Sequence, residues 1–502
     1  MNPTEVELKL LLPDTDAATL EQTLSQLPLL AACPPRREWL WNRYYDTAAQ
    51  SLRRQRSALR LRCISAQPWP EAEPARPPAG EWVQTFKTAG ISQGGLSRRG
   101  EWESNVASGE LDPAALARTP WAEFDPEGEL FAQLQPCFDT RCRRTTWLLQ
   151  QDDGSRIELA LDVGEIAAGG RLLPMLELEL ELQAGEPDAL FQLARTIAER
   201  VAVLPCDASK AERGYALAQG LVHAPARARA VHLGTDTAPQ AAALQAMSGM
   251  LEQFTRNLAS LLHANDPELV HQARVAWRRW HSSERLFRPW LAKLPAHAGL
   301  RPLLDALGRL RDLDVAGTET LPAWTERYVD GDAQRRAQAE QALHRLQQCG
   351  ELQRHEARQL LTQSETGLGL LALAQWLHEL GQPTQQPDAR SKVERDWARE
   401  RAVRLLRRLR QAVEGATEAQ QHRARLLAKR ARYGVETLHD LLPEKKSGRW
   451  VREASQVQAR LGAERDLLRA IALLQQGGET GGLLDFLRGV AAANSHGRGQ
   501  PG

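Results

Sequence analysis

The hydrophobic period of this 502-residue chain changes once, between residues 217 and 239. Before this point, short runs such as residues 5–10 and 176–182 alternate apolar and polar residues, and turns rich in Gly and Pro separate the runs. Alternation with period two predicts strands, and short turns between strands favour an antiparallel sheet. After this point, long segments rich in Leu, Ala and Arg repeat apolar residues at helical spacing. This second pattern predicts an all-helical part.

The domain boundaries follow from the same change of pattern. We expect a first domain over residues 1–217, a linker over residues 218–238, a helical domain over residues 239–493 and a disordered tail over residues 494–502. A chain of this length also exceeds one ordinary hydrophobic core, so a multidomain protein is expected on size alone.

The overall charge of the chain is nearly balanced, with a formal net charge of +1. Such a chain has no bulk field that would attract nucleic acid or a membrane surface, so we expect neither as a partner. Only eight of the 64 basic residues are lysine. Arginine suits bidentate recognition of phosphate, but a GC-rich genome explains most of this bias. The placement of the arginines is therefore more informative than their number.

Cysteine usage and hydropathy bear on the cellular compartment. The six cysteines are scattered without a C-x-x-C pair, and no signal peptide precedes them. No apolar stretch approaches the roughly 20 residues that a membrane span needs. These features predict a cytoplasmic protein, and they leave its oligomeric state open.

Charged residues fill the polar positions of the predicted strands. The acidic positions are Glu5, Glu7, Glu101, Glu103, Glu158, Asp162, Glu177, Glu179 and Glu181. The basic positions are Lys9, Arg60, Arg62, Lys87, Arg99, Arg143, Arg144, Lys210 and Arg213. In an ordinary sheet such side chains face solvent, whereas a barrel could hold them inside and pack its apolar residues outward against helices. An interior with both signs of charge is costly unless a highly charged guest occupies it, and triphosphate with a divalent metal is such a guest.

The order of these motifs resembles one known family. Glu5-x-Glu7-x-Lys9 is the hallmark of the CYTH superfamily of triphosphate tunnel enzymes. Further matching segments lie at residues 44–47, 59–62, 86–87, 99–103, 144–147, 158–162, 177–181 and 209–215. The resemblance implies an antiparallel eight-stranded β-tunnel with flanking helices, an α+β domain. It also implies metal-dependent hydrolysis or cyclisation of triphosphate substrates.

The resemblance implies roles for the charged residues as well. The expected substrate-binding residues are Lys9, Arg60, Arg62, Lys87, Arg99, Arg144, Lys210 and Arg213. The expected ligands of Mg²⁺ or Mn²⁺ are Glu5, Glu7, Glu101, Glu103, Asp162, Glu177 and Glu179. The expected catalytic residues are Lys87, which would spread transition-state charge, and Glu177 or Glu179, one of which would orient or deprotonate the attacking water. The sequence does not separate the two glutamates.

The helical part contains an internal repeat. His271, Arg274, Arg278, Arg279 and His281 recur with identical spacing as His422, Arg425, Lys429, Arg430 and Arg432. Residues 307–313 likewise recur as residues 461–467. Most residues of each basic set share one helix face about 80° wide. A single face of this kind is most simply a solvated surface, but its repetition favours a binding function and two similar bundles.

This part resembles a CHAD domain in residues 270–275, 307–315 and 422–436. The resemblance implies an all-α pair of pseudo-symmetric four-helix bundles with a basic groove that binds inorganic polyphosphate, without hydrolytic activity of its own. The expected polyphosphate-binding residues are His271, Arg274, Arg278, Arg279, His422, Arg425, Lys429, Arg430 and Arg432.

A CYTH domain followed by a CHAD domain resembles the arrangement of bacterial inorganic triphosphatases. We therefore expect hydrolysis of tripolyphosphate to diphosphate and phosphate. An adenylate cyclase, or a thiamine or nucleoside triphosphatase, would need an organic pocket at one tunnel mouth. Trp39, Trp41, Tyr44 and Tyr45 could supply that pocket or could equally belong to the core. A non-catalytic polyphosphate-binding protein is the third alternative, and the intact acidic rows argue against it.

Overall fold

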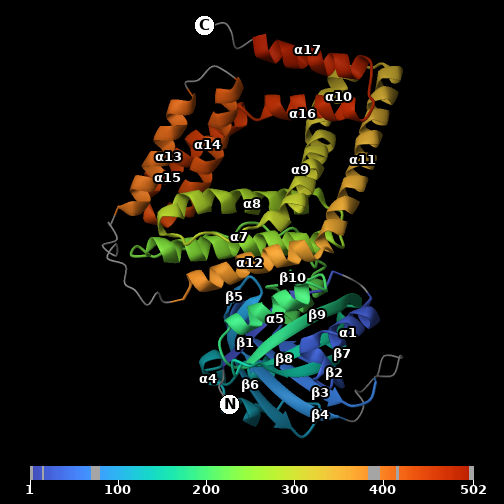
Figure 1. The fold of residues 1–502 in the computed structure, drawn as a ribbon, viewed down its shortest axis with the longest axis vertical. Helices are drawn as coiled ribbons and strands as arrows, with labels where there is room; N and C mark the ends of the chain where they lie inside the picture. Colours follow the sequence, from blue (N-terminus) through green and yellow to red (C-terminus); the bar gives the residue numbers. More distant parts are fainter. Residues whose placement is uncertain (1–3, 14–15, 69–79, 383–395, 414–417, 497–502) are drawn as a thin grey trace.

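The computed structural model describes residues 4–13, 16–68, 80–382, 396–413 and 418–496. A closed antiparallel barrel forms the N-terminal part, and helices form the C-terminal part (Figure 1). The predicted fold class, an eight-stranded barrel with flanking helices followed by an all-helical region, is confirmed. Of the predicted tail, residues 494–496 end the last helix and residues 497–502 lie outside the described residues.

Eight strands close the barrel. They are β1 (Thr4–Leu11), β2 (Arg36–Asp46), β3 (Ala58–Ser65), β4 (Glu81–Lys87), β6 (Leu96–Val106), β7 (Gln135–Gln150), β8 (Arg156–Ala168) and β9 (Arg171–Ala184). Their order around the barrel is β1-β9-β8-β7-β2-β3-β4-β6, and β6 pairs again with β1. Two short strands, β5 (Ile91–Gln93) and β10 (Leu204–Pro205), pair with β6 and β1. Closure leaves the eight strands without a free edge.

The barrel holds charges inside and apolar side chains outside. On β1, Glu7 and Lys9 are buried at 3% and 5% exposure, although both are charged. The alternate residues Leu8 and Leu10 belong to a hydrophobic core outside the barrel wall that includes Phe191 of α5 (Asp188–Ala198). The barrel alternative is therefore correct, and the solvated-strand alternative is wrong for these rows.

Besides α5, further short helices lie around the barrel. They are α1 (Ala17–Ser25), α2 (Pro28–Ala31), α3 (Ser51–Arg54), α4 (Trp121–Phe124) and α6 (Lys210–Ala218). A capping box begins α6, because the Ser209 hydroxyl accepts from the Glu212 amide and the Glu212 carboxylate accepts from the Ser209 amide. Tyr215 of α6 packs against Phe138 of β7, with ring centroids 5.1 Å apart. This apolar contact holds α6 against one end of the barrel.

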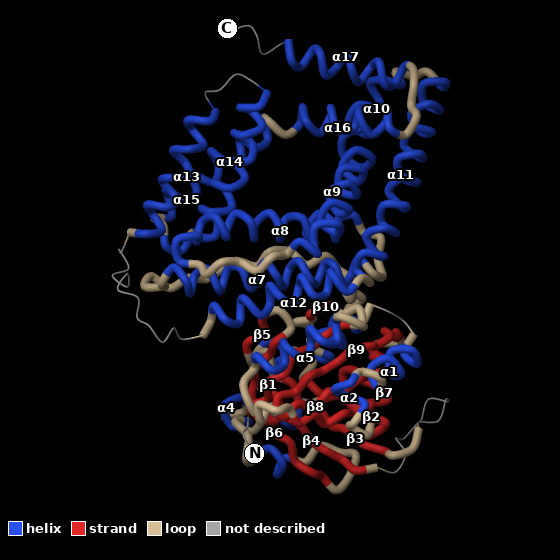
Figure 2. Tube along the Cα trace, in the orientation of Figure 1, coloured by secondary structure: helices blue, strands red, loops and turns tan. Residues whose placement is uncertain are grey.

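Eleven helices follow in the described part of the C-terminal region. They are α7 (Pro239–Leu261), α8 (Pro267–Phe287), α9 (Arg301–Val315), α10 (Leu321–Val329), α11 (Ala333–Leu361), α12 (Ser364–Leu380), α13 (Trp397–Val413), α14 (Glu418–Thr437), α15 (Glu444–Arg460), α16 (Ala463–Gln476) and α17 (Gly482–His496). Helices α8, α9, α14 and α16 frame the centre of this region (Figure 2). The basic repeat lies on α8 and α14, and the second repeated segment lies on α9 and at the start of α16. Among the described helices, none is long and apolar enough to cross a bilayer.

The two regions share one hydrophobic core. Leu8 and Leu180 of the barrel belong to the same buried cluster as Phe254 of α7 and Leu377 of α12. The approach is close, since a Cβ on Gly94 would lie 2.5 Å from the Cβ of Ala374, and Gly94 also has a φ of +60° that favours glycine. The domains are therefore packed against each other directly.

Candidate active site

Strands β1, β4 and β6 bring one group of opposite charges together inside the barrel. Arg99 donates from Nε to Glu5 Oε2 at 2.6 Å and from Nη2 to Glu7 Oε1 at 3.0 Å. Lys87 Nζ lies 2.8 Å from Glu101 Oε1 and 3.2 Å from Glu5 Oε1. Burial by itself would raise the pKa of Glu101, but Lys87 and a hydrogen bond with Glu5 lower it to about 2. This carboxylate is thus ionised at neutral pH.

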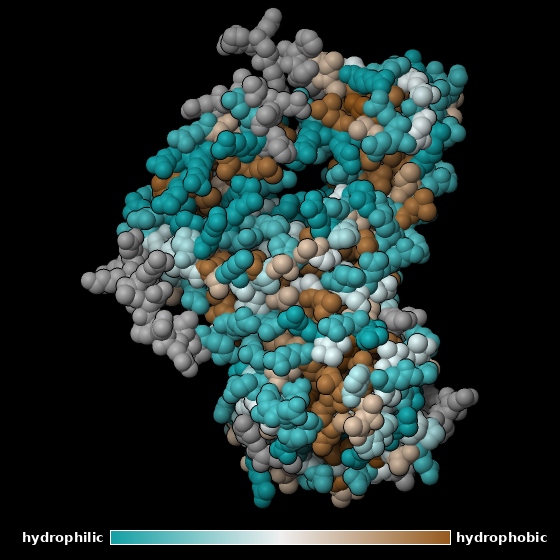
Figure 3. Space-filling view, in the orientation of Figure 1, coloured by the Kyte–Doolittle hydropathy of each residue, from teal (hydrophilic) through white to brown (hydrophobic). Residues whose placement is uncertain are grey.

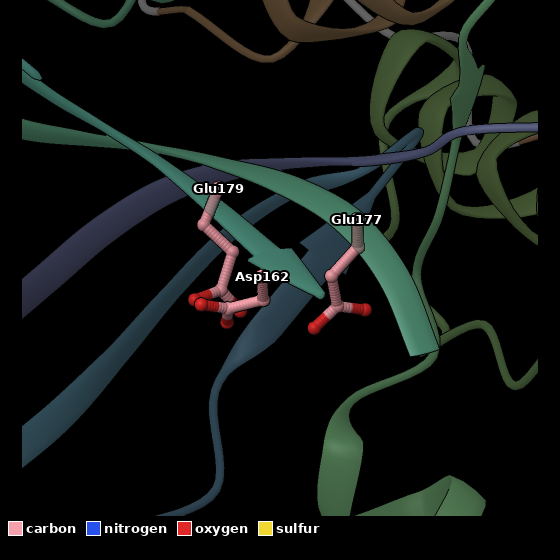
Figure 4. Close-up of side chains that lie close together, drawn as sticks. All are labelled: Asp162, Glu177 and Glu179. Carbon is pink, nitrogen blue, oxygen red and sulfur yellow. The ribbon is translucent and has the colours of Figure 1, made fainter. Parts of the chain in front are cut away.

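Strands β8 and β9, next to β1 in the barrel, bring three carboxylates together. Asp162 pairs with Glu177 in the strand register, and Glu179 lies two residues further on the same face of β9. One oxygen from each of the three side chains lies within 4.8 Å of the others. Figure 4 shows the three carboxylates pointing toward one another.

Lys210 and Arg144 each pair with more than one of these carboxylates. Lys210 Nζ, from α6, lies 2.7 Å from Glu179 Oε1 and 2.8 Å from Asp162 Oδ2, and it also pairs with Glu177. Arg144 donates from Nε to Asp162 Oδ1 at 2.7 Å and from Nη2 to Glu179 Oε2 at 2.6 Å. Burial would raise the pKa of Asp162, yet the attraction of Arg144 and Lys210 lowers it to about 2.

The third cation at these carboxylates is Arg213, which α6 also carries. Arg213 donates from Nη2 to Glu177 Oε2. Because Lys210 and Arg213 stand three residues apart on one helix, the position of α6 sets the charge balance at Glu177 and its neighbours.

A separate cationic group lies at Arg60 and Arg62. Arg60 donates to Glu103 Oε1 at 3.2 Å, whereas Arg62, among the described residues, has no carboxylate within 4.0 Å. The Nε of Arg62 donates instead to Asn42 Oδ1 at 2.8 Å. Burial and repulsion from Arg60 and Arg144 lower the pKa of Arg62. Arg62 is therefore an interior cation whose charge a bound anion would stabilise.

Glu181 has the opposite environment. Burial, followed by repulsion from Glu5 and Glu158, raises its pKa to about 8. The Glu181 carboxyl is therefore largely protonated at neutral pH. A cation bound here would favour its ionised form.

The residues present fit a hard divalent metal ion. Asp162, Glu177 and Glu179 offer only oxygen atoms, which are the ligands that Mg²⁺ and Mn²⁺ prefer. Glu5 and Glu7, expected as further ligands, lie on the neighbouring strand β1 and pair with Arg99 of β6.

The structure brings every expected substrate-binding, metal-ligating and catalytic residue of the barrel into the interior charge groups. Lys9 joins them by lying 3.3 Å from Glu7 Oε1 and 3.8 Å from Glu179 Oε1. Arg143, also among the charged rows, points outward instead and pairs with Glu21 of α1 at 2.7 Å.

Of the aromatic residues, Tyr44 stacks on Phe138 with ring centroids 4.5 Å apart, in the hydrophobic cluster that also contains Tyr215 of α6. Trp41 contacts Trp82. These two side chains pack as core.

Sequence reasoning missed two polar residues that position the arginines. Asn42 accepts from Arg62 and donates from Nδ2 to Thr140 Oγ1 at 2.8 Å. Thr85 accepts from Arg60 at 3.1 Å. A signal existed, because Asn42 and Thr85 each lie at an inward position directly opposite their arginine in the strand register.

Two families match the chain. The CYTH domain family matches residues 3–215, and the CHAD domain family matches residues 245–475. The chain joins a CYTH domain to a CHAD domain. The barrel with its interior charge groups is the CYTH domain, and the helices that follow are the CHAD domain.

Individual proteins are similar to each part. An inorganic triphosphatase of Haemophilus influenzae is 31% identical over 215 residues, which are 42% of this chain and 54% of that one. The match thus covers about half the length of that relative. The crystal structure of the CHAD domain from the plant Ricinus communis is 28% identical, covers 55% of this chain and 93% of that chain, and has a TM-score of 0.47. A Hippeastrum structure of adenylyl cyclase type, with a dominant triphosphatase activity, is 21% identical, covers 43% of this chain and 95% of that one, and has a TM-score of 0.30.

In the CHAD domain, the two copies of the basic repeat meet. Repulsion from Arg278 and Arg425, after burial, lowers the pKa of Lys429 to about 7. Arg425 Nη2 lies 3.7 Å from Asp466 Oδ1, and Arg465 adds a further positive charge nearby. Helices α8, α14 and α16 thus supply one cationic cluster, made of Arg278, Arg425, Lys429 and Arg465.

The other predicted residues divide between different surroundings. Arg274 lies beside Arg278 and Arg311, and His271 also faces Arg311. The Arg279 guanidinium faces Glu436 and Arg432 instead. Arg311 and Arg465, the equivalent arginines of the second repeat, were absent from the predicted set although their spacing is repeated. Figure 3 shows a hollow between α9, α14 and α16 with a largely hydrophilic rim.

Proposed function

We propose that the protein hydrolyses inorganic triphosphate in the CYTH barrel and binds polyphosphate on the CHAD domain. The proposal of hydrolysis rests on one observation. Three carboxylates contact Lys210 and Arg144 inside a closed barrel. Charges of both signs in one interior suit a guest that is itself a metal-bound polyanion. The similarity to an inorganic triphosphatase supports the same substrate class.

The basic side chains of the barrel bind and orient the triphosphate. Arg62, which has no carboxylate partner among the described residues, is available to the phosphate oxygens without breaking an ion pair. Lys87 and Arg99 must exchange part of their contact with Glu5 and Glu101 for phosphate. Such donors stabilise the charge that spreads over the transferred phosphoryl group.

Asp162, Glu177 and Glu179 would hold Mg²⁺ or Mn²⁺, which supplies charge neutralisation and an acidified water when bound. In the reaction, the oxygen of water bonds to the terminal phosphorus, the bridging P–O bond breaks, and diphosphate leaves. Glu177 or Glu179 accepts or orients the proton of that water. Lys210 pairs with both of these carboxylates.

The polyphosphate proposal rests on the cationic cluster of the CHAD domain. Arg278, Arg425, Lys429 and Arg465 come from three helices. Burial, and then repulsion from the neighbouring arginines, lowers the pKa values of Arg425 and Lys429. Binding of a linear polyanion would offset this repulsion between like charges and stabilise the cluster. The chain also carries Arg279, Arg430, Arg432 and the histidine positions 271 and 422 on the repeated helices as further candidates.

Two alternatives remain open to experiment, an adenylate cyclase or organic triphosphatase and a polyphosphate-binding protein without catalysis. The purified chain is incubated with Mg²⁺ or Mn²⁺ and, separately, tripolyphosphate, ATP and thiamine triphosphate. We expect phosphate release to be fastest with tripolyphosphate and no cyclic AMP from ATP. Faster turnover of an organic triphosphate would favour the first alternative, and no turnover of any substrate would favour the second.

A further inference from the structure

A cavity of about 320 Å³ lies where the two domains meet. Its wall is formed by α6, by the first residues of β9, by the connecting residues 221–229 and by α7. This volume suits a small organic molecule. The cavity lies on the outer side of α6, and the interior charge groups lie on the other side.

Three polar atoms of this wall lack partners. Gln253 is 4% exposed and donates from Nε2 to Gln272 Oε1 at 2.8 Å, but its Oε1 has no hydrogen-bond donor among the described residues. The same holds for Asp207 Oδ2 and for Arg213 Nε, which lacks an acceptor. Buried polar atoms without partners are costly and uncommon in native proteins. The three residues line the cavity, but these atoms are not themselves accessible, so a ligand in the cavity would bond them only after their side chains shift.

The rest of the wall defines the chemistry of that ligand. Leu173, Leu204 and Val222 supply apolar surface, and the rings of His223 and His263 lie 5.2 Å apart beside them. Burial lowers the pKa of both histidines, so the rings are uncharged at neutral pH. The exposed Arg227 stands at the same wall, and so does Arg229, which pairs with the wall residue Glu252 at 3.5 Å. An aromatic body would pack between the apolar and imidazole surfaces, and an anionic group would meet the arginines.

One residue connects this cavity with the barrel. Arg213 lines the cavity and donates from Nη2 to Glu177 inside the barrel. Its neighbour Glu212 accepts from Arg256 of α7 at 3.1 Å, so the CHAD domain also holds this part of α6. We propose that the cavity is an effector site for a small aromatic anion, which acts on the barrel by drawing Arg213 away from the interior. Binding at the cavity is independent of the proposed function, whereas the effect on turnover rests on it.

The binding experiment uses 8-anilinonaphthalene-1-sulfonate, a fluorescent aromatic anion, titrated against the full chain. We expect saturable binding of one dye per chain. Ala259→Phe, which fills the cavity from α7, should weaken binding at least tenfold. The exposed Ala337→Phe on α11 serves as the matched control and should bind as wild type does. Arg227→Glu changes an exposed residue of the wall and does not fill the cavity. It should weaken binding at least threefold, and it tests the site independently if Ala259→Phe folds poorly.

No saturable binding to wild type, or equal binding by wild type, Ala259→Phe and Arg227→Glu, would overturn the proposal. The second measurement is the KM for tripolyphosphate with and without saturating dye. We expect at least a threefold increase in wild type and Ala337→Phe and no increase in Ala259→Phe. An unchanged KM in a wild-type enzyme that turns over would overturn the coupling through α6. Absence of any wild-type turnover would instead count against the proposed function, and the binding result would stand alone.

Discussion

Lys210 Nζ lies 2.7 Å from Glu179 Oε1, in the middle of the three carboxylates that could hold a divalent cation. Desolvation lowers the pKa of this lysine, but Asp162 and the two glutamates raise it well above its ordinary value. The ammonium therefore stays charged at neutral pH and neutralises the site. A lysine and a metal ion are alternative partners for the same oxygens.

The first prediction concerns the removal of this lysine. Lys210→Met leaves the buried Asp162 and Glu177 and the partly buried Glu179 with less positive charge, and we expect the free energy of unfolding to fall by about 3 kcal/mol without divalent metal. Mn²⁺ should then raise the melting temperature of Lys210→Met by more than it raises that of wild type, because the metal replaces the lost charge. Thermal unfolding with and without Mn²⁺ measures both effects. Equal metal-induced shifts would contradict this assignment.

The second prediction compares two arginines with different partners. Arg62→Ala removes a cation that pairs with no carboxylate among the described residues, so we expect KM for tripolyphosphate to rise about tenfold with little change in melting temperature. Arg144→Ala leaves Asp162 buried without its bidentate partner, and the free energy of unfolding should fall by about 3–5 kcal/mol. Steady-state kinetics and thermal unfolding of both variants separate the two effects. Equal loss of stability in the two variants would show that Arg62 is structural.

Much of the barrel could be predicted from its sequence because strand alternation has an unambiguous period. The alternation at Glu5, Glu7 and Lys9 is consistent with these side chains lying inside the barrel or facing solvent. Only the pairing of β1 with its neighbours in the closed sheet decides between the two. Charge complementarity between rows far apart in sequence was visible, and the fold brings those rows together.

Other features could not be read from the chain. The pairing of Arg213 with Glu177 depends on the tertiary position of α6 at the end of the barrel, which no local pattern encodes. Asn42 looks like an ordinary strand residue until its register with Arg62 is known. On α8 and α14, helical spacing predicts that Arg278 and Lys429 lie on similar faces. The approach of the two helices to each other depends on tertiary packing, which the spacing does not encode.

The third prediction concerns the pH dependence of polyphosphate binding. Burial first, and then Arg278 and Arg425, lower the pKa of Lys429 to about 7, with Arg465 adding to the repulsion and Asp466 opposing it. The side chain is charged below pH 7 and increasingly neutral above it. Polyphosphate affinity should therefore decrease by about fivefold between pH 6 and pH 8 as one favourable charge is lost.

Lys429→Arg keeps its charge over this range and should reduce the pH dependence of the dissociation constant. Lys446→Arg, at an exposed position of α15, is the matched control and should retain the wild-type profile. An unaltered profile in Lys429→Arg would assign the titration to another group.

The fourth prediction concerns the two candidate catalytic glutamates. Glu177→Gln and Glu179→Gln each keep the shape of the side chain while removing a charge that Lys210 and the arginines contact. We expect kcat for tripolyphosphate to fall about 100-fold or more in each variant. Glu186→Gln, in the exposed turn after β9, should be as active as wild type. The variant with the larger loss at saturating Mg²⁺ identifies the carboxylate that acts on water.

The most direct test of triphosphate hydrolysis in the barrel is phosphorus-31 NMR of tripolyphosphate incubated with the full chain and Mg²⁺. We predict that diphosphate and phosphate appear in equal amounts, and that the Glu177→Gln, Glu179→Gln double variant produces neither at a measurable rate. Absence of product with the wild-type chain in both Mg²⁺ and Mn²⁺, or equal rates for wild type and the double variant, would contradict the assignment.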